Sequence, residues 1–508
     1  MKIKVLVFLI LLITLPYVIG VRGGGEDLVF NGFLLNIIDG NSYIGKMREG
    51  WLGSWQFSML SSSVAPGENY IYLFYIFLGH VARWLGLSLV FTYHAARVSG
   101  AILLWLMLYR FVDVYLDGRG LMAKTIALVL VCFGSGLGWL GAMFSWFTGD
   151  FWIPEAYPFL SMYTNPHFPL GLALVIDFFV QLRKPFKRKN IVWLVLKGML
   201  LGVILQFGVV VAGVVAGGIQ LWDMIKKQNP IRWWNLWFLI PGGLILIYQL
   251  VVLKTDPVLA GWDAQNIAIT PMLWDVLVSF SPPLILAVWA IVQMVRSGQI
   301  KEYKLLVVWS VAGLFLAFFP FQLQRRFLLG YYIPLACLAA ITIDWAIDQG
   351  RRFLRTGAML VIAVSFMTNL VVIGFAIKEV QQHQPDLFYP KSMQSAFDWM
   401  LANRPQENVV LSAPRTGIII PGETGWRVVF GHPLETPNAY LTQLTLEQIF
   451  YGMKSPNEIL EYIEMMGVDY VFIGPLEREF GSDLTWADQF PVVYKSADVT
   501  IYQTGVDS

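Results

Sequence analysis

Residues 5–19 read VLVFLILLITLPYVI, an uncharged apolar run that follows Lys2 and Lys4. Similar blocks recur through the first 380 residues, separated by short charged or Pro- and Gly-containing stretches. A helix needs about 20 apolar residues to cross a bilayer. The first run, with its basic flank, fits either an uncleaved first helix or a signal peptide, and we favour the uncleaved helix. The pattern predicts about eleven spans, at residues 5–19, 93–109, 121–141, 168–182, 191–205, 207–222, 235–253, 277–295, 305–320, 331–347 and 357–377.

The composition of the chain indicates the same class of protein. Its 508 residues are 56% hydrophobic and 14% charged, and its mean hydropathy is +0.60, whereas soluble domains carry roughly 25% charged residues. This composition excludes a water-soluble globular protein. Cys132 and Cys337 both lie in apolar helical stretches, so we expect them to pack in the bundle and to leave the C-terminal segment without a disulfide.

Basic and acidic residues are distributed unevenly. Before residue 385 there are 29 Lys and Arg and 18 Asp and Glu, and from there on 7 and 16. Eleven spans place the termini on opposite sides, and a cytoplasmic N-terminus puts 19 basic residues in inner segments and 8 in outer segments before the tail. This bias predicts a multi-pass protein of the inner (plasma) membrane with an extracytoplasmic C-terminal domain. The membrane accounts for the basic excess, so we expect no nucleic-acid partner.

From Pro385 onward, short apolar runs alternate with turn residues. We therefore divide the chain into a transmembrane domain, 1–384, and a small soluble α/β domain, 385–508, which we interpret as accessory. The Pro-Gly-Glu-Thr-Gly sequence at 421–425 predicts a turn, and Ser455-Pro456-Asn457-Glu458 predicts a capped helix start. We expect a helix at 392–402, two further helices after residue 430, and strands at 408–412, 427–430, 468–473, 491–495 and 499–502.

The connection between the first two spans, 21–92, is unusually long, and long ordered connections are often functional. Within it, residues 70–85 read YIYLFYIFLGHVARWL. We lay this segment on the outer surface, because a span here would place the Arg-rich 183–189 segment outside. Its His80 and Trp84 suit an amphipathic helix at the membrane interface.

Asp39 is the strongest candidate for a catalytic group in this connection. It follows the apolar run 34–38, which must lie near the bilayer surface, so we expect its carboxylate to be partly desolvated. Such a carboxylate is suited to take a proton from an acceptor hydroxyl that attacks a sugar. The residues alone leave a structural alternative open, in which Asp39 caps a short helix beginning near Ser42 or sits in an Asp-Gly turn with Gly40.

The order of these parts resembles the GT-C superfamily of membrane glycosyltransferases, which use polyprenyl-phosphate sugars. The matching features are Asp39 followed at i+4 by Tyr43, the surface helix YLFYIFLGHVARWLGLS, and a second span opening with His94-Ala95-Ala96-Arg97. The resemblance covers residues 1–380. It implies that Asp39 is the base or positions the acceptor, and that Tyr43 lies at the substrate, with alternatives for the base at Glu26, Asp27 and Glu68.

The chain departs from two subgroups of that superfamily. Asp39 is followed by Gly40, without the Asp-Glu pair of protein O-mannosyltransferases, and the tail has no W-W-D-Y-G sequence of oligosaccharyltransferase subunits. These departures disfavour protein O-mannosylation and metal-dependent N-glycosylation. The sequence indicates no metal ligands and no cofactor, and it does not point to a divalent metal.

A second outer connection, 141–167, sets carboxylates among aromatic residues, as in FWIPEAYPFL at 151–160. Carbohydrate sites often combine carboxylates with aromatic rings, so Glu155 and His167 are candidate substrate-binding residues. The alternative is structural, with His167 in the first turn of the next helix and the aromatic residues in the interfacial belt.

A basic pair, Arg325 and Arg326, lies on the predicted outer side, where few such charges are expected. A polyprenyl-phosphate leaving group would compensate them, because guanidinium groups bind phosphate in bidentate fashion. Pairing with lipid headgroups or with an acidic loop residue is the alternative. Lys254, on a neighbouring outer connection, is a weaker phosphate candidate.

These features predict a fold class, a membrane all-α bundle of about 11 transmembrane helices with a small C-terminal soluble α/β domain. They predict an inverting glycosyltransferase of GT-C type that moves a sugar from a polyprenyl phosphate to an acceptor at the outer face. The expected partners are the lipid-linked sugar, the bilayer and an acceptor that the sequence does not name. A transporter or flippase for a lipid-linked cell-envelope precursor is the main alternative, with Lys197 and Asp177 as its clearest intramembrane charges.

Overall fold

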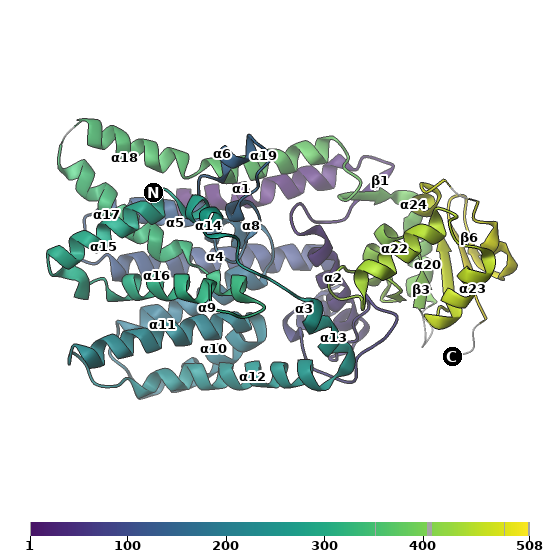
Figure 1. Ribbon diagram of the computed structural model, residues 1–508, viewed down its shortest axis with the longest axis horizontal. Helices are drawn as coiled ribbons and strands as arrows, with labels where there is room; N and C mark the ends of the chain where they lie inside the picture. The colour runs from purple at the N-terminus through teal and green to yellow at the C-terminus, as the bar shows by residue number, and fades with distance from the viewer. Residues whose placement is uncertain (1, 351, 404–408, 482, 506–508) are drawn as a thin grey trace. The chain divides into compact units, whose positions relative to one another are not determined.

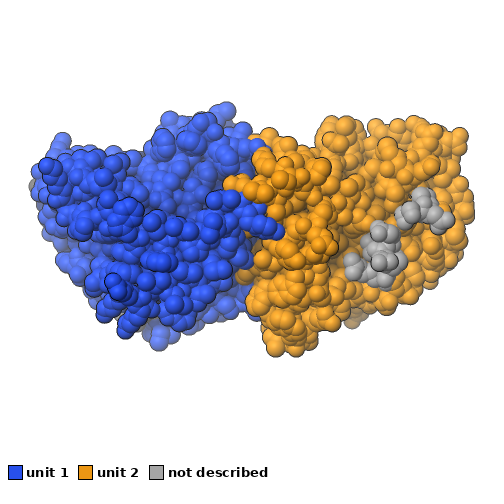
Figure 2. Space-filling view, turned by 90° about the horizontal axis from the view of Figure 1, so that it is seen from below, with its two compact units in different colours: residues 1–15, 95–248, 268–376 blue, residues 16–94, 249–267, 377–508 orange. Residues whose placement is uncertain are grey.

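The computed structural model describes residues 2–350, 352–403, 409–481 and 483–505. The chain forms two compact units, each assembled from separate stretches of sequence (Figure 2). Unit 1 comprises residues 1–15, 95–248 and 268–376, and unit 2 comprises residues 16–94, 249–267 and 377–508. The long connection 21–92 therefore belongs almost entirely to the same unit as the predicted domain 385–508.

Unit 1 is a bundle whose long helices run side by side (Figure 1). Its apolar runs are helical because a helix satisfies all of its own backbone hydrogen bonds, which lipid cannot do. The main helices are α1 (Lys2–Gly23), α4 (Leu89–Tyr115), α5 (Leu121–Phe133), α9 (His167–Leu182), α10 (Ile191–Ile204), α11 (Gln206–Ile225), α12 (Leu236–Thr255), α14 (Leu273–Phe280), α15 (Pro283–Arg296), α16 (Lys304–Ala317), α17 (Tyr332–Asp348), α18 (Arg352–Val364) and α19 (Met367–Gln381). Four of them, α1, α4, α12 and α19, include residues of both units. Short helices α6 (Gly138–Ala142), α7 (Gly149–Trp152) and α8 (Pro158–Tyr163) occupy the connection after α5.

Within the described residues, seven helices are long and apolar enough to cross a membrane, or eight if the bent pair α14 and α15 is one span. Each of the eleven predicted segments overlaps a helix. Several of these helices are short, however, since α10 and α16 have 14 residues each, about 21 Å at 1.5 Å per residue. A predominantly helical membrane bundle is confirmed, and eleven spans remain a prediction.

Unit 2 is built on a five-stranded sheet in the order β4-β3-β5-β7-β6. Strands β3, β4 and β5 are parallel, and β7 pairs antiparallel with both β5 and β6. Alternate residues of a strand face opposite sides. Val471 and Ile473 therefore join one apolar core with α22 and α23, and Phe472 joins another with α20. The elements are β3 (Val409–Leu411), β4 (Arg427–Val428), β5 (Tyr470–Ile473), β6 (Val492–Lys495), β7 (Thr500–Gln503), α20 (Gln394–Ala402), α21 (Pro414–Thr424), α22 (Ala439–Phe450), α23 (Pro456–Met465) and α24 (Pro475–Arg478).

Most of the elements predicted for the tail are confirmed. The first helix, the two later helices and the five strands all occur, and Ser455 and Glu458 form the predicted capping box. Residue 408, at the predicted start of one strand, lies outside the described residues. The predicted turn at 421–425 is wrong, because residues up to Thr424 continue α21. Gly422 lies in the helix where it packs on α2, and a Cβ there would come within 3.0 Å of Ile44.

The connection 21–92 pairs with the backbone of the tail at two places. Strand β1 (Leu28–Phe30) pairs antiparallel with β2 (Phe388–Pro390). At the edge strand β4, the Val428 N–H donates to the carbonyl of Leu60, and Ser62 forms a bridge with Phe430. Because the edge of β4 is paired in this way, the connection 21–92 completes the fold of unit 2.

Helices α2 (Ile37–Leu52) and α3 (Leu73–Leu85) cross at close range within unit 2. A Cβ at Gly50 would lie 1.9 Å from the Ile76 carbonyl oxygen, and one at Gly79 would lie 1.8 Å from that of Met47. With 13 residues, α3 is about 20 Å long, shorter than the hydrocarbon core of a bilayer. Its length supports the prediction that it does not span. His80 differs from the expected interfacial placement, because it is buried and its Nε2 contacts the Ser54 carbonyl at 2.9 Å.

Candidate active site

Asp39 lies in the first turn of α2. The helix begins after Asn36, whose backbone is left-handed with φ of 55°, and the helix dipole favours a carboxylate near this end. Gly40 continues the helix and packs on Phe33, whose ring would lie 2.3 Å from an added Cβ. Both structural alternatives for Asp39 are therefore wrong, since no helix begins at Ser42 in this described segment and the Asp-Gly pair is helical.

Asp39 lines a cavity of ≈ 430 Å³ inside unit 2. The walls come from the start of α2, residues 385–388, α21 and residues 432–434. This volume lies within the range of small-molecule sites, and the Asp39 side chain is 41% exposed. Polar groups alternate with isoleucine side chains on the wall, the polar lining residues being Asn31, Asn36, Asp39, Asn41, Asp386, Arg415 and His432.

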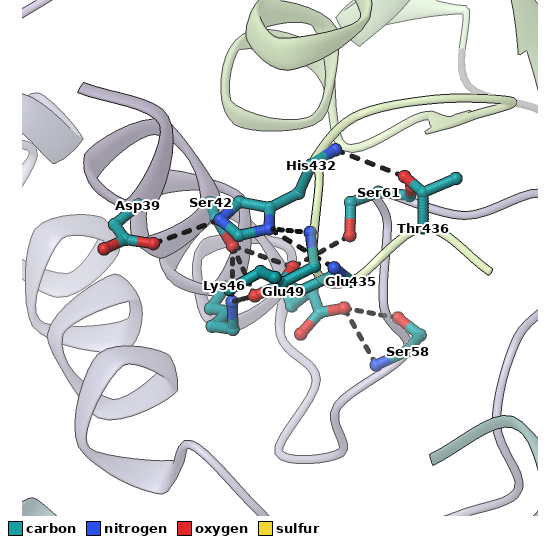
Figure 3. Close-up of polar contacts among 10 residues, drawn as sticks. Asp39, Ser42, Lys46, Glu49, Ser58, Ser61, His432, Glu435 and Thr436 are labelled. Carbon is teal, nitrogen blue, oxygen red and sulfur yellow. Dashed lines mark hydrogen bonds and ion pairs between the residues drawn. The ribbon is translucent and has the colours of Figure 1, made fainter. Parts of the chain in front are cut away.

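His432 is the direct partner of Asp39 in this wall (Figure 3). Its Nε2 lies 3.1 Å from Asp39 Oδ1. Its Nδ1 accepts the backbone N–H groups of Leu434 at 3.0 Å and Glu435 at 3.3 Å. A ring nitrogen that accepts hydrogen bonds carries no proton, so the other nitrogen carries it. The geometry therefore corresponds to a neutral imidazole that donates from Nε2 to Asp39.

A buried ion pair lies about two turns further along α2. Lys46 Nζ is 2.7 Å from Glu435 Oε1, with side chains only 3% and 9% exposed. The hydroxyls of Ser42 and Ser61 also donate to the Glu435 carboxylate, at 2.8–2.9 Å (Figure 3). Burial by itself would raise the pKa of Glu435, but the charge of Lys46 and the hydrogen bonds from Lys46 and Ser61 outweigh burial and lower the pKa to about 2. This pair holds the 432–436 loop on α2.

Glu49 is a second buried carboxyl on α2. Ser58 donates to its Oε1 through both the backbone N–H, at 2.9 Å, and the hydroxyl, at 2.5 Å. Within the described residues, its Oε2 is buried without a hydrogen-bond partner. Burial raises the pKa of Glu49 to about 7, against the opposing effect of the Ser58 hydrogen bonds. The side chain is thus poised to hold a proton near neutral pH.

Unit 1 brings together three of the residues that the sequence proposed for substrate binding. Glu155 Oε1 lies 3.5 Å from both Arg325 Nε and an Arg326 guanidinium nitrogen. Glu155 is 1% exposed, and the Arg325 guanidinium lies 5.0 Å from the centre of the Trp152 ring. The acidic loop residue that the alternative interpretation required is therefore present, and two guanidinium groups share its carboxylate.

The remaining proposed residues have clear local surroundings. Tyr43 stacks on Tyr75 with ring centres 4.2 Å apart. His167 begins α9, and its ring centre lies 4.0 Å from that of Phe168. Lys254, whose side chain is 68% exposed, forms an ion pair with Asp263 at 2.6 Å. Their roles in substrate binding remain predictions.

No protein-family model matches the sequence, and no curated protein resembles it significantly in sequence. Solved structures do resemble its fold. The Archaeoglobus fulgidus oligosaccharyltransferase, tethered to an acceptor peptide containing an NVT sequon, matches with a TM-score of 0.56 at 12% identity, over 99% of this chain and 74% of the other. Oligosaccharyltransferase AglB from the same organism, in complex with an inhibitory peptide and a dolichol phosphate, matches with a TM-score of 0.55 at 11% identity, over 100% and 74%.

ArnT from Cupriavidus metallidurans, bound to undecaprenyl phosphate, matches with a TM-score of 0.50 at 11% identity, over 98% of both chains. These structures are membrane glycosyltransferases of the GT-C type. The fold of this chain is GT-C. The GT-C resemblance drawn from the sequence is confirmed as a likeness of fold, and this GT-C chain is a multi-pass membrane protein.

The comparisons leave the question of a metal open for this GT-C chain. One structure of the Archaeoglobus enzyme contains zinc and sulfate. Among the described residues here, no group of three or more His, Cys, Asp or Glu side chains is placed to hold a metal ion. We therefore assign no residue of this chain to a metal.

Sequence reasoning missed His432, Lys46 and Glu435 as neighbours of Asp39 in this candidate site. In the sequence, His432 lies just after the predicted strand 427–430, in a tail that we interpret as accessory. Two signals were available, since the chain has only five histidines and this one follows a strand, where loops often carry function. Nothing in the sequence paired it with Asp39, 393 positions away.

Proposed function

We propose that this protein is an inverting glycosyltransferase that moves a glycosyl unit from a polyprenyl phosphate to an acceptor hydroxyl at the outer face of the plasma membrane. The observation that carries the proposal is the Asp39 carboxylate on the wall of the unit 2 cavity, held by His432 and still accessible. The GT-C fold supports it, because two of the similar structures were solved with dolichol phosphate or undecaprenyl phosphate bound.

In the proposed reaction, the acceptor oxygen attacks the anomeric carbon from the face opposite to the phosphate. The bond from the anomeric carbon to the phosphate oxygen breaks, and the polyprenyl phosphate leaves with the electron pair. The acceptor proton passes to Asp39. Single displacement inverts the anomeric configuration, and a positioned base of this kind contributes about 100- to 10,000-fold.

Arg325 and Arg326 are proposed to stabilise the charge that develops on the leaving phosphate. Guanidinium groups form short, charge-assisted bonds with phosphate oxygens. The neighbouring Glu155 Oε2 is buried without a hydrogen-bond partner among the described residues, which is costly for a carboxylate. A sugar hydroxyl of the donor would supply the missing hydrogen bond, which supports Glu155 as a substrate-binding residue.

An apolar cavity of ≈ 520 Å³ in unit 1 is suited to part of the polyprenyl chain. It lies between helices α1, α5 and α19, and its lining includes Phe8, Leu12, Phe133 and Ile373. Isoprene units carry no polar atoms, so burial among these side chains leaves no group unsatisfied.

The transporter alternative is not favoured by any observation on the described residues. Lys197 and Asp177, its clearest intramembrane charges, form an ion pair with each other at 2.7 Å. Pairing of this kind accounts for both charges without a transport path.

The proposed function is tested by replacing Asp39 with Asn. We expect transfer to fall by about 1,000-fold or more while expression and donor binding stay near wild type, because Asn preserves shape and removes the base. Transfer is followed by mass spectrometry of glycans and glycolipids in a deletion strain that carries each variant. Glu461→Gln, which replaces an exposed carboxylate of α23 in the same unit, is the matched control and should retain activity. Full complementation by Asp39→Asn would refute the assignment.

A further inference from the structure

The 432–436 loop fixes the position of His432 from both sides of its backbone. Thr436 Oγ1 accepts the N–H groups of Gly431 at 3.1 Å and His432 at 3.2 Å, and it donates to the Ser61 carbonyl at 2.7 Å. Glu435 of the same loop is bound to Lys46. The backbone that carries His432 is therefore attached to α2 and to the connection that follows it, so the imidazole cannot move independently of Asp39.

The imidazole itself has little freedom. Its side chain is 5% exposed, and Nδ1 is occupied by the N–H groups of Leu434 and Glu435. A proton on Nδ1 would face two donors, so these contacts favour the Nε2–H tautomer. That tautomer directs its single donor at Asp39 Oδ1.

We propose that His432 is a positioning residue for the transfer reaction, and that the soluble segment 427–436 is part of the catalytic centre. The inference rests on the proposed role of Asp39 as base. A lone carboxylate in the first turn of a helix has several rotamers, whereas a neutral donor on one oxygen holds the group in one orientation toward the cavity. Because proton transfer depends steeply on geometry, loss of this contact should lower the rate about 100-fold.

Two variants of similar size separate orientation of Asp39 from support of the loop. In His432→Asn, the shorter amide oxygen stands near the place of Nδ1 and keeps an acceptor for the backbone N–H groups, but the donor from residue 432 to Asp39 Oδ1 is lost. In His432→Gln, the longer amide places an N–H donor near the place of Nε2. We expect the turnover number to fall about 100-fold in His432→Asn with the KM for the donor nearly unchanged, and to fall less than about 10-fold in His432→Gln.

The test of the inference is which of the two variants, His432→Asn or His432→Gln, has the higher activity. A purely structural role predicts the reverse, since Asn preserves the loop bonds better than Gln, and Asn activity equal to or above that of Gln would overturn the proposal. The double variant Asp39→Asn/His432→Asn should be no slower than Asp39→Asn alone, because His432 acts only through Asp39. If Asp39→Asn is itself fully active, the proposed function fails. If it is inactive while His432→Asn matches wild type, only the present inference fails.

A measurement on the wild-type chain covers the case in which a variant fails to fold. With ¹⁵N-labelled histidine in nanodiscs, magnetic resonance should detect a neutral Nε2–H histidine whose signal shifts in Asp39→Asn. A signal for His432 as the Nδ1–H tautomer would overturn the proposal, as would one that is unchanged in Asp39→Asn.

Discussion

Two polar pairs join α2 to the same loop, and they differ in almost every physical respect. Lys46 and Glu435 are charged, nearly inaccessible and supported by two serine hydroxyls. Asp39 and His432 meet at the wall of a cavity, and the Asp39 side chain is 41% exposed. The difference teaches that one junction serves two purposes. The buried pair holds the loop on α2, and the accessible pair is the one to which we assign the chemistry in our proposal.

We expect the largest loss of stability from Lys46→Met, which tests whether the buried pair is structural. It leaves the Glu435 carboxylate buried without its counter-charge, which typically costs about 3–5 kcal/mol. We expect the free energy of unfolding of unit 2 to fall by that amount, measured by urea titration of the full chain in nanodiscs with amide hydrogen exchange followed over residues 427–436. The control is Lys254→Met, whose ion pair with Asp263 is exposed and should cost no more than about 1 kcal/mol.

A double replacement measures how strongly Lys46 and Glu435 depend on each other for stability. In Lys46→Met/Glu435→Leu both charges disappear together, and an apolar pair of similar volume is often as stable as the buried ion pair. We expect the double variant to recover most of the stability lost in Lys46→Met, giving a coupling energy of about 2–3 kcal/mol in a double-mutant cycle. Additive losses would show that the two side chains act independently and that the pair does not hold the loop.

The pH dependence of stability separates Glu49 from Glu435. Because burial raises the pKa of Glu49 to about 7 from an ordinary 4.5, its contribution to folding is complete below about pH 4.5 and is lost as pH rises through 7. Glu435 does the opposite, since its pKa of about 2 gives stability that is present above pH 4.5 and lost as pH falls through 2. Across each of these pH ranges, the free energy of unfolding should change by up to about 3 kcal/mol.

Glu49→Gln should remove the loss of stability between pH 4.5 and 7, because Gln is neutral throughout and still accepts from Ser58. The check is the urea midpoint of unit 2 measured at several pH values in both proteins. An unchanged pH slope in the variant would place the titrating group elsewhere.

The smallest effect concerns the charged cluster of unit 1. Arg325→Ala and Arg326→Ala should each raise the KM for the polyprenyl-phosphate donor about 10-fold, because each removes a charge-assisted bond to phosphate worth about 1.5 kcal/mol. Initial rates across donor concentrations give the value, and Arg22→Ala, an exposed arginine outside the cluster, is the control. If both variants keep the wild-type KM, the two arginines serve only to balance the charge of Glu155. Their role is then structural, like that of Lys46 and Glu435.

The sequence by itself determined much of this protein. Apolar blocks of bilayer length predicted the helical membrane bundle, and alternating short runs predicted the strands of the tail, because both patterns follow from local burial. The sequence also indicated Asp39 as the candidate base. It indicated Glu155, Arg325 and Arg326 as candidate substrate-binding residues, because they are charged residues in connections between predicted spans. Hydrophobic periodicity and the position of a charged residue can be read within one segment, so the sequence of that segment is enough to predict them.

Tertiary structure alone decided the rest. The turn predicted for 421–425 became part of a helix because Pro421 and Gly422 pack against α2. The Asp-Gly pair became helical because Gly40 meets Phe33. His432 lies beside Asp39 because the connection 21–92 and the tail fold into one compact unit. Contacts between residues nearly four hundred positions apart depend on how whole elements pack, and no local periodicity encodes that packing.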